Sequence, residues 1–158
     1  MKCIQSIVAL FILLSACATQ VEESQPENGR IAFDTVRGGN LEIYSMFFNG
    51  SDETNLTRRS QDDMNPDWSP DGSKIAWEAY QWGTTDIFVM DADGGNQTRL
   101  TDNPAPDYSP TWALDGSQIV FCSGRSGHSD IHAMNVDGSD QRRLTQSSSE
   151  KYSPDWKP

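Results

Sequence analysis

The sequence repeats with a fixed period. Residues 31–33 (Ile-Ala-Phe) recur as residues 75–77 (Ile-Ala-Trp) and 119–121 (Ile-Val-Phe), and Ile31, Ile75 and Ile119 are spaced 44 residues apart. The same spacing relates three further sets of residues: Glu42, Asp86 and Asp130; Leu56, Leu100 and Leu144; and Trp68, Trp112 and Trp156. A period of about 40–45 residues made of short β-type segments is typical of propeller blades rather than helical solenoids.

Each repeat predicts four short strands, A to D. Strand A ends at a Trp, and an Asp-Gly turn follows it at Asp71-Gly72 and Asp115-Gly116, where Gly accepts a positive φ without steric strain. The remaining strands are expected at 74–79 and 118–123 (B), at 86–90 and 130–134 (C), and ending at 99–101 and 143–145 (D). In strand B, Ile75 and Trp77 point to one face and Ala76 to the other. Apolar residues on both faces suit a sheet packed between neighbouring blades.

Residues 66–77, 86–94 and 99–101 together are similar to the PD40 repeat of TolB-like β-propellers. The resemblance covers residues 30–158. It implies an all-β fold of three four-stranded blades of 44 residues. The third copy departs from the pattern at Thr111, at residues 113–114 and at His132, and the first copy lacks the Trp-Ser-Pro-Asp-Gly opening.

The array is offset from whole blades, because it starts at a strand B and ends at residues 152–156, which read as a strand A. Three blades are too few to close a propeller, which typically has about 4–8 blades. TolB-like propellers resemble six-bladed rings, so we expect a head-to-tail homodimer in which the Trp156 strand completes the first blade of the other copy. The alternatives are a truncated gene product and an open three-blade wedge.

The N-terminal residues predict export. Residues 1–16 combine a positive start with an apolar run over 4–14, as in a signal peptide, and residues 14–17 (Leu-Ser-Ala-Cys) resemble a bacterial lipobox. The resemblance implies that Cys17 carries a lipid and that residues 17–29 form a tether. The residue after Cys17 is not Asp, which favours lipid anchoring to the outer membrane, facing the periplasm. A position at the cell surface is the alternative.

The charge and the cysteines exclude several classes of protein. The formal net charge is −11, which repels phosphate backbones, so nucleic acid is not an expected partner. Once Cys3 leaves with the signal peptide and Cys17 is acylated, Cys122 has no partner for a disulfide. The sequence has no zinc spacing, and Asp91-x-Asp93-Gly94 lacks a full calcium-loop pattern. We expect no metal and no cofactor.

The candidate binding residues lie in loops. In a four-stranded blade the B–C and D–A connections share one face, and loops on a rigid scaffold often carry binding residues. We name as candidates Tyr80, Trp82, Asp107, Tyr108, His128 and Tyr152. The alternative for Tyr108 and Tyr152 is that they line the entrance of strand A. The recurring residues are expected to be structural: Trp68, Asp71, Gly72, Asp86, Trp112, Asp115, Gly116, Asp130 and Trp156.

The sequence shows no catalytic set. His128 and His132 are the two histidines, and a contiguous Ser-His-Asp run does not itself make a triad. We therefore expect a non-enzymatic module that presents its loop face to another envelope protein, and the family resemblance implies a Tol–Pal-type partner. The alternatives are a carbohydrate-binding or carbohydrate-processing propeller, with Tyr80 and Trp82 stacking on sugars, and a truncated propeller fragment.

Overall fold

The computed structural model describes residues 29–146 and 148–157, so the predicted signal peptide, Cys17 and most of the predicted tether lie outside the described residues. The described residues form eleven β-strands. Within these residues there is no helix long and apolar enough to cross a membrane.

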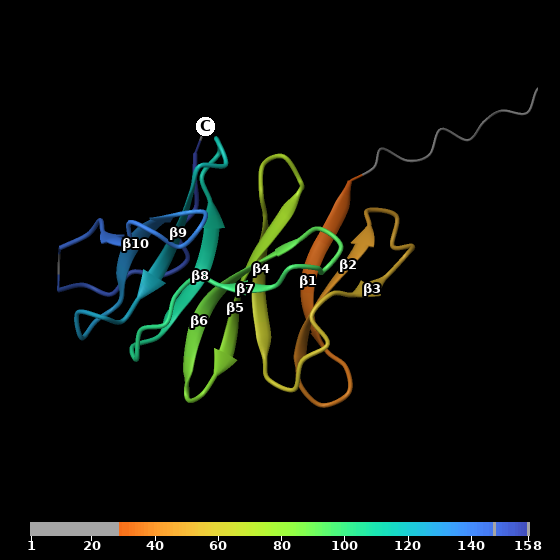
Figure 1. Cartoon of the computed structure of the whole chain (residues 1–158), viewed down its shortest axis with the longest axis horizontal. Coiled ribbons are helices and arrows are strands. Elements are labelled where there is room, and N and C mark those ends of the chain that lie inside the picture. Colours follow the sequence, from red (N-terminus) through yellow and green to blue (C-terminus); the bar gives the residue numbers. More distant parts are fainter. Residues whose placement is uncertain (1–28, 147, 158) are drawn as a thin grey trace, which may run out of the picture.

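The strands form three antiparallel sheets that stand side by side (Figure 1). The first sheet contains β1 (Arg30–Val36), β2 (Leu41–Phe47) and β3 (Thr54–Asn55). The second contains β4 (Asp63–Trp68), β5 (Lys74–Gln81), β6 (Thr84–Asp91) and β7 (Thr98–Arg99). The third contains β8 (Asp107–Trp112), β9 (Gln118–Ser123), β10 (Asp130–Asn135) and β11 (Arg142–Arg143). Each sheet is one propeller blade, which confirms the predicted all-β fold.

The core lies between the blades. Ile75 and Trp77 of β5 are fully buried against the first blade, where they meet Ile43 and Leu56. Ala76, between them in sequence, faces the third blade and joins a second buried cluster. This second cluster also contains Ile87, Val89, Leu100, Trp112, Ile119, Phe121 and Met134. Burying each large apolar side chain contributes about 1.5–3 kcal/mol, so the contacts between neighbouring blades stabilise the array.

Strand A carries a bulge in both complete blades. The pairing register shifts between Met64 and Asp67 in β4 and at the equivalent place in β8, because Asn65 and Ser109 have φ values of 51°. The bulge turns the amide of each residue toward the preceding blade. There Asn65 N donates to Asp34 Oδ1 at 3.1 Å, and Ser109 N donates to Glu78 Oε2 at 2.5 Å. One repeated acidic position on strand B therefore links successive blades.

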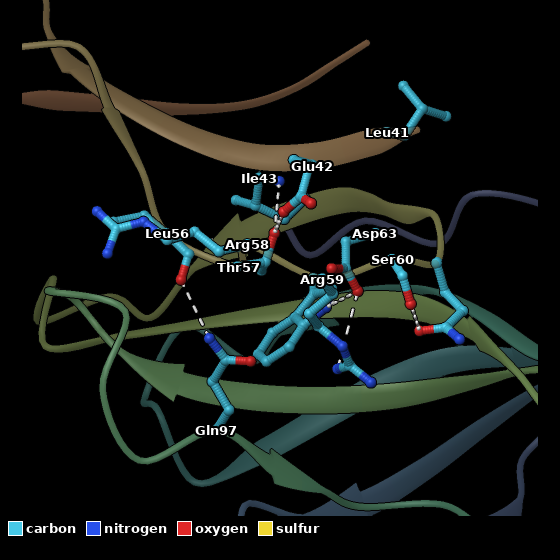
Figure 2. Close-up of polar contacts among 12 residues, drawn as sticks. Leu41, Glu42, Ile43, Leu56, Thr57, Arg58, Arg59, Ser60, Asp63 and Gln97 are labelled. Carbon is cyan, nitrogen blue, oxygen red and sulfur yellow. Dashed lines mark hydrogen bonds and ion pairs between the residues drawn. The ribbon is translucent and has the colours of Figure 1, made fainter. Parts of the chain in front are cut away.

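A second repeated contact joins the C–D turn of one blade to strand D of the blade before it. Gln97 Nε2 donates to the Leu56 carbonyl at 3.0 Å (Figure 2), and Gln141 Nε2 donates to the Leu100 carbonyl at the same distance. Gly94 lies so close that a Cβ there would be 2.8 Å from the Leu56 oxygen. The turn needs Gly for this approach as well as for its positive φ.

The acidic residue that opens strand C braces strand D within the same blade. In the first blade, Glu42 accepts from Thr57 Oγ1 at 2.7 Å, and that oxygen accepts from Ile43 N at 3.0 Å (Figure 2). Asp86 and Asp130 contact Thr101 and Thr145 in the same way in the other blades. Because these carboxylates are used inside every blade, their recurrence has a structural explanation.

Candidate functional site

The B–C and D–A connections meet on one face of the array. Gly124 N donates to the Pro106 carbonyl at 2.9 Å, and Asn40 Nδ2 donates to the Gln61 carbonyl at 2.8 Å. Each of these bonds ties a B–C connection to the D–A connection beside it. We call this surface the loop face; the hairpins between β1 and β2 and between β5 and β6 mark it at the lower edge of Figure 1.

Trp82 is the most unusual residue of the loop face. It forms the two-residue turn between β5 and β6 together with Gly83, and φ is 49° at Trp82 and 94° at Gly83. A turn with two positive φ values favours Asn-Gly, and the left-handed conformation costs a bulky residue about 1–2 kcal/mol. Trp82 is nonetheless 82% exposed. The chain therefore holds a large aromatic ring in solvent at an energetic cost, which is a feature of binding sites.

An ion pair with a buried carboxylate holds Arg99 beside the Trp82 ring. The Arg99 guanidinium carbon lies 5.1 Å from the centre of the ring, within the range of a cation–π contact. Arg99 in turn donates to Asp86 Oδ2 at 2.7 Å, and Asp86 is fully buried. Burial raises the pKa of Asp86, and Arg99 opposes this effect. Tyr80 lies two residues away in the sequence and is 46% exposed, so one hairpin of the second blade carries two exposed aromatic side chains.

The expectation that Asp107 belongs to an exposed D–A loop is wrong. Asp107 is the first residue of β8, is fully buried, and accepts from Arg125 Nη2 at 2.6 Å. The strand starts there because the bulge at Ser109 lengthens strand A. Tyr108 is half-buried, and its hydroxyl donates to Ser129 Oγ at 2.5 Å. Burial raises the pKa of Tyr108.

His128 lies among charged groups of the third blade. Its Nε2 is 3.2 Å from Asp130 Oδ2 and 3.3 Å from Arg143 Nη2. Ser126 Oγ donates to the carboxylate of Asp130 at 2.5 Å rather than to the imidazole. A nucleophilic serine needs a base as its hydrogen-bond partner, and this arrangement does not provide one.

The predicted binding residues come from separate blades. Tyr80 and Trp82 belong to the second blade, and Tyr108 and His128 to the third. Tyr152 is 65% exposed in the C-terminal segment that follows β11. Among the candidates, Tyr80 and Trp82 form the pair of exposed aromatic side chains that one hairpin holds together.

The sequence did not indicate a cleft of about 490 Å³, which lies on the face opposite the loop face. Turn residues of the second and third blades border it, including Asp71, Asp115 and Asp137. Each of these carboxylates accepts the backbone N–H of the Ser two residues further on. These bonds and nearby hydroxyls lower the pKa of Asp71 to about 2. The acids therefore stabilise their own turns, and the described residues contain no group of three His, Cys, Asp or Glu residues that could hold a metal ion.

Comparison with known families identifies the fold family. Residues 63–158 match the family model PD40, described as TolB beta propeller domain. This chain belongs to the PD40 family. A putative TolB from Agrobacterium tumefaciens is 31% identical with a TM-score of 0.75, over 79% of this chain and 45% of that one. TolB from Acinetobacter baumannii is 23% identical with a TM-score of 0.66, over 77% of this chain and 31% of that one.

This PD40 chain spans less than half of either TolB structure. Puromycin hydrolase also has a similar fold, at 20% identity and a TM-score of 0.59, over 70% of this chain and 19% of that one. A search of curated proteins gave no match. The TolB-like propeller fold is thus established, whereas the ligand has to be inferred from the loop face.

Proposed function

We propose that this PD40 chain is a non-enzymatic protein-binding module of the bacterial envelope, which presents its loop face to another envelope protein. The observation that carries the proposal is the exposed, left-handed Trp82 held beside Arg99. Trp, Tyr and Arg are the residue types most enriched at protein-binding hot spots. Trp82, Tyr80 and Arg99 bring one of each to the same blade.

The proposed location follows from the N-terminal residues. The signal-peptide pattern and the Cys17 lipobox support export and lipid anchoring to the outer membrane, facing the periplasm. The similarity to TolB structures makes an envelope protein of the Tol–Pal type the first partner to test. The net charge of −11 favours a partner whose contact surface is basic.

The test compares two exposed aromatic residues on opposite faces. Trp82→Ala removes the ring from the loop face, and Phe48→Ala removes a ring that is 53% exposed in the turn after β2. Binding of each purified variant to the Pal-type lipoprotein of the same organism is measured by calorimetry. We expect Trp82→Ala to weaken binding by about 10- to 100-fold, as at a hot spot, and Phe48→Ala to leave binding unchanged. Equal effects of the two substitutions, or no binding by the unmodified chain, would contradict the proposal.

A carbohydrate ligand is the competing function, since aromatic rings also stack on sugars. A panel of envelope glycans in the same calorimeter separates the two. Binding of a glycan that is lost in Trp82→Ala, without binding of the lipoprotein, would replace the protein partner with a carbohydrate.

A further inference from the structure

The edge of β1 that faces away from β2 is open. β1 pairs with β2 on one side, and among the described residues no strand pairs with its other side. In the second and third blades strand A occupies that side, as β4 and β8. The consequence is visible at one repeat position: Ile75 and Ile119 are fully buried, whereas Ile31 is 42% exposed. Such an edge invites pairing with another strand.

The C-terminal segment 151–157 already has the shape of a strand A. Ser153 has a φ of 47°, and the bulge residues Asn65 and Ser109, which occupy the same repeat position, have φ values of 51°. Lys151 N donates to the Ser129 carbonyl at 3.0 Å, which attaches the segment to the third blade. Residues 151–157 belong to none of the strands of the described structure, and Trp156 is 39% exposed where Trp112 is 5% exposed.

We propose that residues 151–156 of one copy pair with β1 of a second copy as its missing strand A, and that the reciprocal pairing closes a six-bladed ring. The repeat determines the register of the pairing. In the second blade Asp67 is paired with Ala76 and Trp68 with Ile75. The equivalent pairs across the two copies are Asp155 with Ala32 and Trp156 with Ile31.

The two open faces carry matching halves of the contact that joins the inner blades. Leu56 and Leu100, which receive the C–D turn of the next blade, are 7% and 8% exposed, whereas Leu144 at the same position is 50% exposed. On the other open face, Gly50 keeps the positive φ of Gly94 but has no atom within 4 Å of an added Cβ. Placing Leu144 of one copy against Gly50 of the other reproduces the contact between Leu56 and Gly94.

A second copy is the occupant that fits both faces at once. The third blade supplies the strand and the Leu144 face, and the first blade supplies the edge and the Gly50 turn, so the contact is head-to-tail. Head-to-tail contacts form closed rings when the rotation closes, and six blades lie within the usual range of about 4–8. Glu53 stands at the position of Gln97 and Gln141 and pairs with Arg37, so the junction lacks one hydrogen bond of the inner junctions.

Disulfide cross-linking in the exporting cell tests this register. Two differently tagged full-length chains are produced together, one carrying Ala32→Cys and the other Asp155→Cys. In the ring these two residues are cross-strand partners, within the roughly 7 Å between Cα atoms that a disulfide tolerates. The matched control pairs Asp155→Cys with Val36→Cys, whose position lies four residues further along β1, about 13 Å away. Chains with a single substitution control for links through the native cysteines.

The proposal predicts a covalent dimer that carries both tags, at least tenfold more abundant for Ala32 with Asp155 than for Val36 with Asp155. Equal yields for the two pairs would overturn it, as would monomers alone. A product in which the Cys of Ala32→Cys is joined to a different protein would also overturn it, because the β1 edge would then have another occupant. Melting curves of the reduced variants that match the unmodified chain exclude misfolding as the cause of a low yield.

Discussion

Trp82 occupies a turn position that ordinarily takes Asn, with its ring almost fully in solvent and a cation beside it. Its left-handed backbone costs about 1–2 kcal/mol, and an exposed cation–π contact returns about 0.5–1 kcal/mol. Trp at this position therefore adds little or nothing to the stability of the blade. Its ring is held in solvent, which distinguishes it from the buried Trp77 and Trp112.

The first prediction concerns Trp82→Asn. Asn suits the two-residue turn, so the gain in backbone free energy offsets the lost contact with Arg99. We expect the free energy of unfolding, measured in urea, to change by less than about 1 kcal/mol. Binding to the partner should weaken as in Trp82→Ala. A large loss of stability would show that Trp82 has a structural role instead.

The second prediction concerns Cys17, which lies outside the described residues. If residues 14–17 form a lipobox, Cys17→Ser abolishes incorporation of a labelled fatty acid and releases the chain from the membrane fraction. Cys122 is the matched control, because it is buried in β9 and Cys122→Ser should leave labelling unchanged. Labelling that persists in Cys17→Ser would contradict the anchor.

The elements of the fold were largely predictable, because one period placed strands, turns and core residues together. The alternation of Ile75, Ala76 and Trp77 correctly predicted two buried faces. The bulge in strand A was not predictable, since Asn65 and Ser109 adopt a positive φ without being Gly. The sequence pattern does not show this bulge, so it starts strand A after Asp107 and places that residue in a loop. The contact between Trp82 and Arg99 was not predictable either, because it joins a turn to a strand 17 residues further along the chain.

The third prediction concerns the carboxyl that links the second blade to the bulge of the third. Burial raises the pKa of Glu78 above its ordinary value of 4.5, although the Ser109 amide opposes this effect. The folded chain therefore resists ionisation of Glu78 more than the unfolded chain does. Its contribution to stability is complete below pH 4.5 and is lost as the pH rises through the raised pKa.

Glu78→Gln removes this ionisation and keeps an oxygen that can accept from Ser109 N. We expect the melting temperature of Glu78→Gln, relative to the unmodified chain, to rise as the pH increases from 4.5 to 7. A difference in melting temperature that stays constant over this range would contradict the predicted shift.

The fourth prediction compares two equivalent turns. Gly94→Ala and Gly50→Ala share the strain of a positive φ, but only Gly94 faces a backbone oxygen at close range. Both substitutions are made in chains kept monomeric by Ile31→Asp. There, Gly94→Ala should lower the free energy of unfolding by about 1–3 kcal/mol more than Gly50→Ala does, because an overpacked contact is destabilising. Urea unfolding measures the difference. Equal losses would show that the contact with Leu56 tolerates a methyl group.

At the scale of the whole molecule, the three blades of the described residues leave an apolar sheet face at each end of the array and the free edge of β1 exposed. Ile31 at one end and Leu144 and Trp156 at the other are exposed, whereas the equivalent Ile75, Leu100 and Trp112 are buried. Closing these ends with a second copy removes the exposed edge and places the two loop faces on one side of a ring. Each ring would then carry two copies of Trp82, so a partner with two binding sites would gain avidity.

The molar mass of the purified full-length chain tests the central claim most directly. Light scattering, with the detergent contribution subtracted, is applied to the unmodified chain, to Ile31→Asp and to Val36→Asp. Ile31 and Val36 are both exposed in β1, but only Ile31 would be covered in the ring. The account predicts twice the mass of one chain for the unmodified protein and for Val36→Asp, and the mass of one chain for Ile31→Asp. A single-chain mass for the unmodified protein at every concentration, or the same mass for both variants, would contradict it.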